Sequence, residues 1–179
     1  MKNNISFLQF QIISTIFILI SGILLHFAYD WSGNNSFIGL FGAVNESTWE
    51  HLKLIFFPML LTLIVGYFVF KNELPNYVCS KTIGIIAAML FTIIFFYTYT
   101  GVIGTNYDFI NIAIFFIAAI LGEYVTYKLA VNNFTCNRYL YTIILISLTF
   151  SFLIFTFNPP KIGLFKSPTD NSYGIQKSS

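Results

Sequence analysis

Charged residues are scarce in this chain of 179 residues: Asp, Glu, Lys and Arg together make up only 9% of it. Soluble domains carry roughly 25% charged residues. Because a soluble protein of this size must cover its surface with polar side chains, the composition excludes a soluble globular enzyme and a disordered protein. The formal net charge is only +2, so the chain also lacks the basic surface that binds nucleic acid.

The chain instead contains several long hydrophobic runs. Helices crossing about 30 Å of hydrocarbon need about 20 apolar residues, and they satisfy their own backbone hydrogen bonds. Because the runs are continuous rather than alternating, they do not fit a transmembrane barrel. We predict an all-α integral membrane bundle of five transmembrane helices in a single domain covering residues 1–179. The spans fall at about 7–28, 46–70, 82–100, 108–129 and 139–157, and an interfacial or flexible tail covers 158–179.

Lysine and arginine positions predict the orientation, because these residues are enriched in cytoplasmic loops. Three segments on one side carry Lys2, Lys71, Lys81, Lys128 and Arg138. The opposite loop at 101–107 carries none, so we predict a cytoplasmic N-terminus and, after five spans, a C-terminus outside. Lysines in the tail oppose this pattern.

Cys79 and Cys136 both fall on the predicted cytoplasmic side. Thiols in the cytosol stay reduced, and two isolated cysteines have no metal-binding spacing. We therefore expect two free thiols.

Ionisable side chains are costly near hydrocarbon, so their positions indicate where a membrane protein has polar contacts or a site. His26 and Asp30 share one face at the end of the first span, since they are four residues apart. The densest polar run, NESTWEHLK at 45–53, begins the second span, where Asn45 or Ser47 can cap a helix. If these two spans are antiparallel neighbours, the two groups meet near the outer leaflet. The candidate ligand-binding residues are His26, Asp30, Glu46, Glu50, His51 and Lys53.

Imidazoles and carboxylates bind zinc and similar divalent ions, so a divalent metal such as zinc is the candidate cofactor. The candidate metal ligands are His26, His51 and Glu50. The same groups can perform acid–base chemistry or bind a cation without chemistry. The structural alternative is a hydrogen-bond and ion-pair network in which Glu50 pairs with Lys53 and fixes the loop. The spacing matches none of the strong zinc motifs.

Glu123 lies within the fourth span, nearer the predicted cytoplasmic side. We expect Lys128, Lys71 or a tyrosine hydroxyl to pair with it; a relay or transport role is the alternative. Small residues four apart, as in Gly84-x-x-x-Ala88, predict close packing of the third and fourth spans.

The run from Leu40 to Lys53, LFGAVNESTWEHLK, resembles a family of small multi-pass membrane proteins of Firmicutes, classed as a domain of unknown function. The segments His26–Trp31, Phe96–Gly101, Gly122–Tyr124 and Asn158–Ile175 are similar to that family too. The resemblance implies a bacterial cytoplasmic membrane. It supplies no activity and no catalytic residues.

Three functions remain open, and the sequence leaves undecided whether the protein is an enzyme. The first is binding or transport of a cation or small polar solute at the outer-leaflet site, with a water-filled path inward along Gln11 and Thr15 toward Glu123. The second is a metal-dependent hydrolase or transferase acting on lipid or envelope head groups. The third is a structural or accessory subunit with no cavity. We rank the first highest. The expected partners are the lipid bilayer and a small polar or lipid ligand, and not nucleic acid.

Overall fold

The computed structural model describes residues 5–132 and 134–175, so Lys2 and Lys177 lie outside the described residues. Within those ranges the chain forms helices and no strands, which confirms the predicted fold class. Five helices are long and apolar enough to cross a membrane: α1 (Phe7–Trp31), α3 (Thr48–Phe70), α4 (Tyr77–Ile103), α5 (Asp108–Val131) and α6 (Arg138–Phe157). A short helix α2 (Ser36–Gly39) lies between α1 and α3, and a 3-10 turn η1 (Gly163–Phe165) lies in the tail.

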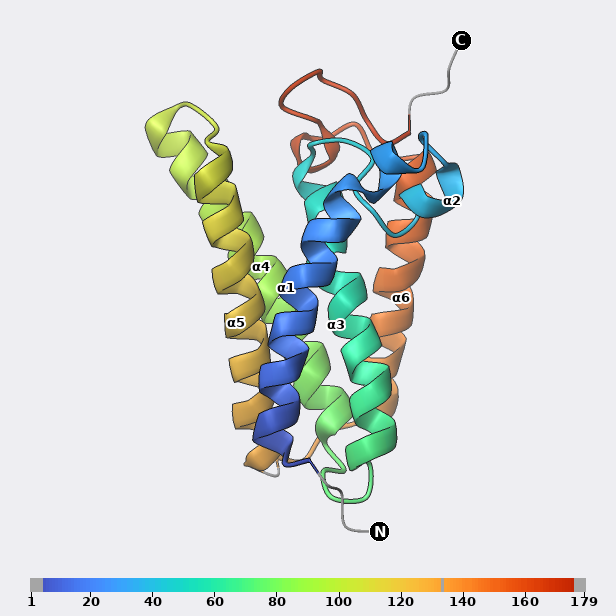
Figure 1. The fold of residues 1–179 in the computed structure, drawn as a ribbon, viewed down its shortest axis with the longest axis vertical. Helices are drawn as coiled ribbons and strands as arrows, with labels where there is room; N and C mark the ends of the chain where they lie inside the picture. The colour runs from blue at the N-terminus through green and yellow to red at the C-terminus, as the bar shows by residue number, and fades with distance from the viewer. Residues whose placement is uncertain (1–4, 133, 176–179) are drawn as a thin grey trace.

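The five long helices run up and down beside one another, with α3 in the interior (Figure 1). About 61% of the apolar stretch of α3 is buried inside the bundle, against 17% for α1 and for α6. The exposed faces of the outer helices are apolar, as in Ile12 of α1 and Ile143 of α6, and suit contact with lipid. We call the end of the bundle with α2 and the tail the tail end, and the opposite end the N-terminal end.

Close packing of α4 against α5 follows from the small residues predicted to form this seam. A side chain at Gly84 would collide with the backbone oxygen of Gly122 and with the side chain of Thr126. The two helices approach closely because neither Gly84 nor Gly122 places a side chain between them. The tail-end tips of the two helices lean outward in Figure 1, although the Tyr97 hydroxyl of α4 still lies 3.4 Å from the Thr48 hydroxyl of α3.

Glu123 of α5 forms a buried ion pair with Lys81 of α4. The prediction of a paired carboxylate is confirmed, but the predicted partners Lys128, Lys71 and a tyrosine were wrong. The antiparallel packing of α4 and α5 explains the difference. It sets the second turn of α4 beside the second half of α5, so Lys81 is the cation that Glu123 meets within the bundle.

Cys79 and Cys136 form a disulfide, which corrects the prediction of two free thiols. Cys79 lies in the first turn of α4, and Cys136 precedes the first residue of α6. Their Cα atoms are 6.5 Å apart, a separation that a disulfide spans. The prediction rested on the compartment alone, and the sequence did not indicate that the α5–α6 connection returns to the start of α4.

The tail packs over the tail end of α3 and α6. The ring of Phe165 lies 4.7 Å from the ring of Trp49, measured between centroids. Farther along, the amide of Ile175 donates to the carbonyl oxygen of Thr156 at 2.9 Å. The tail therefore packs on the start of α3 and on the end of α6.

Candidate metal centre

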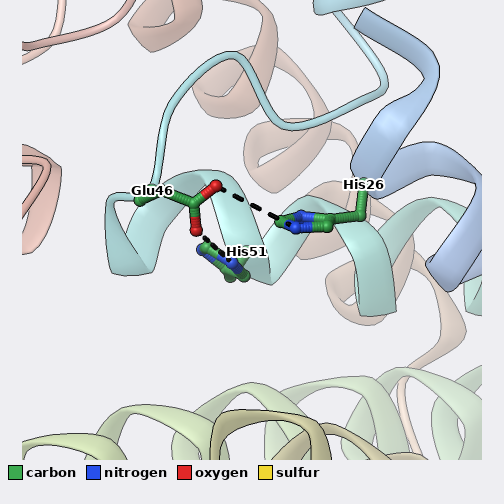
Figure 2. A group of neighbouring side chains, drawn as sticks. All are labelled: His26, Glu46 and His51. Carbon is green, nitrogen blue, oxygen red and sulfur yellow. Dashed lines mark ion pairs between the residues drawn. The ribbon is translucent and has the colours of Figure 1, made fainter. Parts of the chain in front are cut away.

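Three side chains from three segments meet at the tail end: His26 from α1, Glu46 from the α2–α3 connection and His51 from α3. Figure 2 shows both imidazoles pointing toward the Glu46 carboxylate. One candidate ligand atom from each residue lies within 4.8 Å of the others. The Glu46 carboxylate oxygens lie 3.3 Å from Nε2 of His51 and 3.9 Å from Nε2 of His26. All three side chains are partly exposed, so solutes can reach them.

The loop that carries Glu46 is held on both sides of this residue. Asn45 accepts a hydrogen bond from the Ser47 amide and donates one to the carbonyl oxygen of Gly174 in the tail. Ser47 caps α3 by accepting from the Glu50 amide, as the sequence predicted. Earlier in the loop, a side chain at Gly42 would collide with the Leu25 backbone of α1. These contacts fix the position of Glu46 beside α1.

The hydrogen bonds of His51 define its protonation pattern. Nδ1 lies 2.9 Å from the carbonyl oxygen of Ser47, and because a carbonyl only accepts, Nδ1 must carry a hydrogen. In a neutral ring Nε2 is then an acceptor, and it faces the Glu46 carboxylate, which is also an acceptor. Two facing acceptors at 3.3 Å need a cation between them, either a proton on Nε2 or a metal ion.

Without a metal ion, a proton between the two atoms would make this contact an ion pair. The hydrogen bond from His51 is the main reason that the pKa of Glu46 lies below its usual range, with partial burial acting in the opposite direction. Metal binding requires a neutral imidazole and an ionised carboxylate, so a metal ion would displace the His51 proton.

His26 is held less firmly than His51. Its Nδ1 atom is buried and has no hydrogen-bond partner among the described residues. The two imidazole rings lie 5.2 Å apart, measured between centroids. His26 is therefore oriented by ring packing against Phe27 and by Glu46, without the carbonyl partner that orients His51.

A zinc ion fits this set with a small movement. Zinc binds nitrogen and oxygen at about 2.0–2.1 Å, which places neighbouring tetrahedral ligands roughly 3.3 Å apart. His51 and Glu46 already have this separation, whereas His26 must move closer, because the three ligand atoms together lie only within 4.8 Å of one another. Two histidines and one glutamate are also the protein ligands of some catalytic zinc sites, and they leave a fourth position open.

A cavity of about 60 Å³ adjoins the group, between α3 and the tips of α4 and α5. Glu46 and His51 line it on one side. Other polar residues and apolar residues complete the wall: Thr48, Thr92, Asn106, Asn111, Leu54, Ile55, Phe96, Ile114 and Phe115. Thr48, Asn106 and Asn111 could not be assigned to the site from the sequence, because nothing in their local pattern connects the 104–107 loop with the start of α3.

Glu50 and Lys53 lie on the other side of α3, inside the bundle. Their charged groups are 2.5 Å apart and are almost completely buried. Lys53 also donates to the carbonyl oxygen of Gly39 and to the Thr156 hydroxyl, while Glu50 accepts from the Val44 amide. This pair connects α3, the loop before it and α6, as the structural alternative predicted.

The structure thus brings together three of the six candidate ligand-binding residues: His26, Glu46 and His51. The metal set suggested by the sequence contained Glu50, but the carboxylate beside the imidazoles is that of Glu46. Since α3 begins at Thr48, Glu46 belongs to the loop and turns toward α1, whereas Glu50 faces Lys53. Asp30 is exposed at the end of α1 and is not one of the three.

Apolar packing separates the metal centre from the Lys81–Glu123 pair. Gln11 donates to the backbone oxygen of Glu123, near the N-terminal end. Between the two polar regions lie fully buried apolar residues, including Ile18, Ile55 and Met59. The expected water-filled path is therefore interrupted by close packing, which argues against transport in this conformation.

Residues 1–175 match a family described as a family of unknown function, DUF6512. The chain belongs to this family. The match covers both the candidate metal centre and the buried ion pairs of this DUF6512 member, and it assigns no activity to them. A search of the curated proteins finds no match, and neither does a search of the solved structures.

Proposed function

We propose that this DUF6512 protein binds a divalent cation, zinc above others, through His26, Glu46 and His51. The observation that carries this proposal is that ligand atoms of two imidazoles and one carboxylate converge, with Nε2 of His51 and the Glu46 carboxylate 3.3 Å apart. The second imidazole adds a third ligand atom within 4.8 Å. Nitrogen and oxygen ligands of this kind suit zinc better than the harder ions calcium and magnesium.

The membrane and its orientation are part of the proposal. The resemblance to proteins of Firmicutes favours a bacterial cytoplasmic membrane. Exposed cations at the N-terminal end, Lys71 and Arg138 among them, favour a cytoplasmic N-terminus. The C-terminus and the metal centre then lie at the outer face, where the centre meets solutes and lipid head groups from outside the cell.

Cation binding is favoured over transport, because buried apolar side chains lie between the centre and the opposite end. The open fourth position favours a second candidate function, a metal-dependent hydrolase or transferase acting on lipid or envelope head groups. A zinc ion with three protein ligands polarises a bound group or activates a bound water. The adjoining cavity is the observation that supports this second function.

The test is metal analysis of the purified protein after exposure to zinc and removal of unbound ion. We expect about one zinc per chain in the wild type and a clear loss in H51A and E46Q. D30N is the matched control, because Asp30 is an exposed acid at the same end of the bundle. No stoichiometric metal in the wild type, or an equal loss in D30N, would refute the proposal. Size-exclusion and circular dichroism profiles establish that each variant is folded.

A further inference from the structure

The cavity beside the metal centre has the features of a ligand compartment. We infer that it receives a tetrahedral oxyanion of the phosphate type, which takes the open fourth position of the metal. This inference rests on the proposed metal centre. It adds the class of ligand, which neither the family nor the metal-binding residues specify.

The net charge of the metal-loaded centre favours an anionic ligand. Two neutral imidazoles, one carboxylate and one divalent cation carry a net charge of +1 together. The remaining cavity wall is uncharged and largely apolar, with Leu54, Ile55, Ile114 and Phe115 facing the space. A positive centre is more attractive to an anion in such surroundings, because weaker screening strengthens the interaction.

The cavity wall also offers hydrogen-bond donors, which favour a ligand with acceptor oxygens. Asn106 and Asn111 line the cavity on the side of α5. The Tyr99 hydroxyl donates its one hydrogen to the amide oxygen of Asn111, 2.5 Å away, and the amide nitrogen of Asn111 donates to the amide oxygen of Asn106. Both amide hydrogens of Asn106 and one of Asn111 therefore remain for a ligand. The wall opposite the metal therefore offers donors, which favours a ligand with several acceptor oxygens.

The volume of the cavity suits a small ligand. A water molecule needs roughly 10–15 Å³ of such space, so the cavity of about 60 Å³ holds about four to six waters. An acyl chain does not fit, so a lipid ligand would place only its phosphate in the cavity. Inorganic phosphate and the phosphate of a lipid head group share this chemistry.

The first experiment uses protein loaded with cobalt(II), whose visible absorption spectrum responds to changes in its ligands, and titrates it with inorganic phosphate in detergent. We expect a saturable spectral change. N111L should weaken phosphate binding about tenfold, the usual effect of one lost hydrogen bond to a charged group. I114W should abolish the response by filling the cavity, with the metal content unchanged.

I117W is the matched control for I114W. Ile117 is 51% exposed on the same helix, one turn from Ile114, and it does not line the cavity. An unchanged response in I117W and a lost response in I114W supports the inference. The inference is wrong if metal-loaded protein shows no saturable response, or if I114W responds as the wild type does. A wild type that binds no metal instead refutes the proposed function itself.

A second arm separates the two sources of phosphate. The same titration is made in nanodiscs of phosphatidylcholine alone and of phosphatidylcholine with phosphatidic acid. If phosphatidic acid weakens the response to inorganic phosphate at least tenfold, the oxyanion site accepts a lipid head group. An equal response in both discs assigns the site to free phosphate.

Discussion

The two imidazoles of the centre should contribute unequally to metal affinity, and this prediction tests the geometry most directly. His51 donates through Nδ1 to the Ser47 carbonyl, a contact that fixes its ring and directs Nε2 toward Glu46. His26 has no such partner for Nδ1 among the described residues. We therefore expect H51A to lose more zinc affinity than H26A.

The size of the difference follows from the partners of the two rings. Removing a partner that orients a metal-bound histidine commonly costs 10–100-fold in metal affinity. His51 has this partner and His26 lacks it, so the loss in H51A should exceed that in H26A by about the same factor. This corresponds to roughly 1.4–2.8 kcal/mol of binding free energy. His26 must also move closer to Glu46 on binding, which lowers its contribution further.

The assay is competition for zinc between each purified variant and a chromophoric chelator at pH 7.5. Both variants remove one imidazole and leave Glu46 in place, so each serves as the control for the other. Equal losses in H26A and H51A, or a larger loss in H26A, would show that the Ser47 contact does not determine ligand strength.

Three further predictions concern the surroundings of the centre. K53M should lower the free energy of unfolding by about 3–5 kcal/mol, because it leaves Glu50 buried without its cation. The double variant E50Q/K53M should recover much of this loss, as measured by thermal unfolding. The lowered pKa of Glu46 means that folding favours its ionised form. The stabilisation from Glu46 is therefore present above the unfolded pKa of about 4.3 and is lost as the pH falls through the lower folded pKa. Melting temperatures measured from pH 7 to pH 3 should decline below about pH 4, and this decline should be smaller in E46Q. The proposed cytoplasmic N-terminus requires that the Cys79–Cys136 disulfide be reduced in growing cells, so a maleimide should label both cysteines after the cells are quenched in acid and denatured. Labelling that appears only after added reductant would show an intact disulfide and place the N-terminal end outside.

The fold class was predictable because it depends on composition and run length. Apolar runs near 20 residues identify all five long helices, and the structure extends them by a few residues at some ends, as in Tyr77–Ile103 for the predicted span 82–100. The seam at Gly84 was predictable too, since small residues four apart describe a local surface of one helix. These features need no knowledge of which helix lies beside which.

Pairings between distant segments were harder to predict. Lys81 as the partner of Glu123, and the disulfide between Cys79 and Cys136, both depend on how α4, α5 and the start of α6 lie together. Asn106 and Asn111 reach the cavity only because the tip of the α4–α5 hairpin lies opposite His51. A single sequence gives no register between helices, so these contacts came from the structure.

The structure also weakens the charge argument for orientation. Lys81 is buried against Glu123, so it does not face the cytoplasm as a free cation. Three exposed cations remain among the described residues of the N-terminal end, against Lys161 and Lys166 at the tail end. The disulfide lies at the end that the charges assign to the reducing side. The maleimide experiment therefore decides which compartment the metal centre faces.

The polar run at 45–53 combines two roles that the sequence presented as alternatives. Residues of a helix rotate by about 100° per position, so His51 points away from Glu50 and toward the cavity. Glu50 and Lys53 face the interior, where they hold the Val44 amide and the Gly39 carbonyl. These contacts fix the loop that delivers Glu46 to the imidazoles. The buried ion pair thus helps to position the proposed metal ligand Glu46, and loss of Lys53 should disturb Glu46 although the two side chains lie on opposite sides of α3.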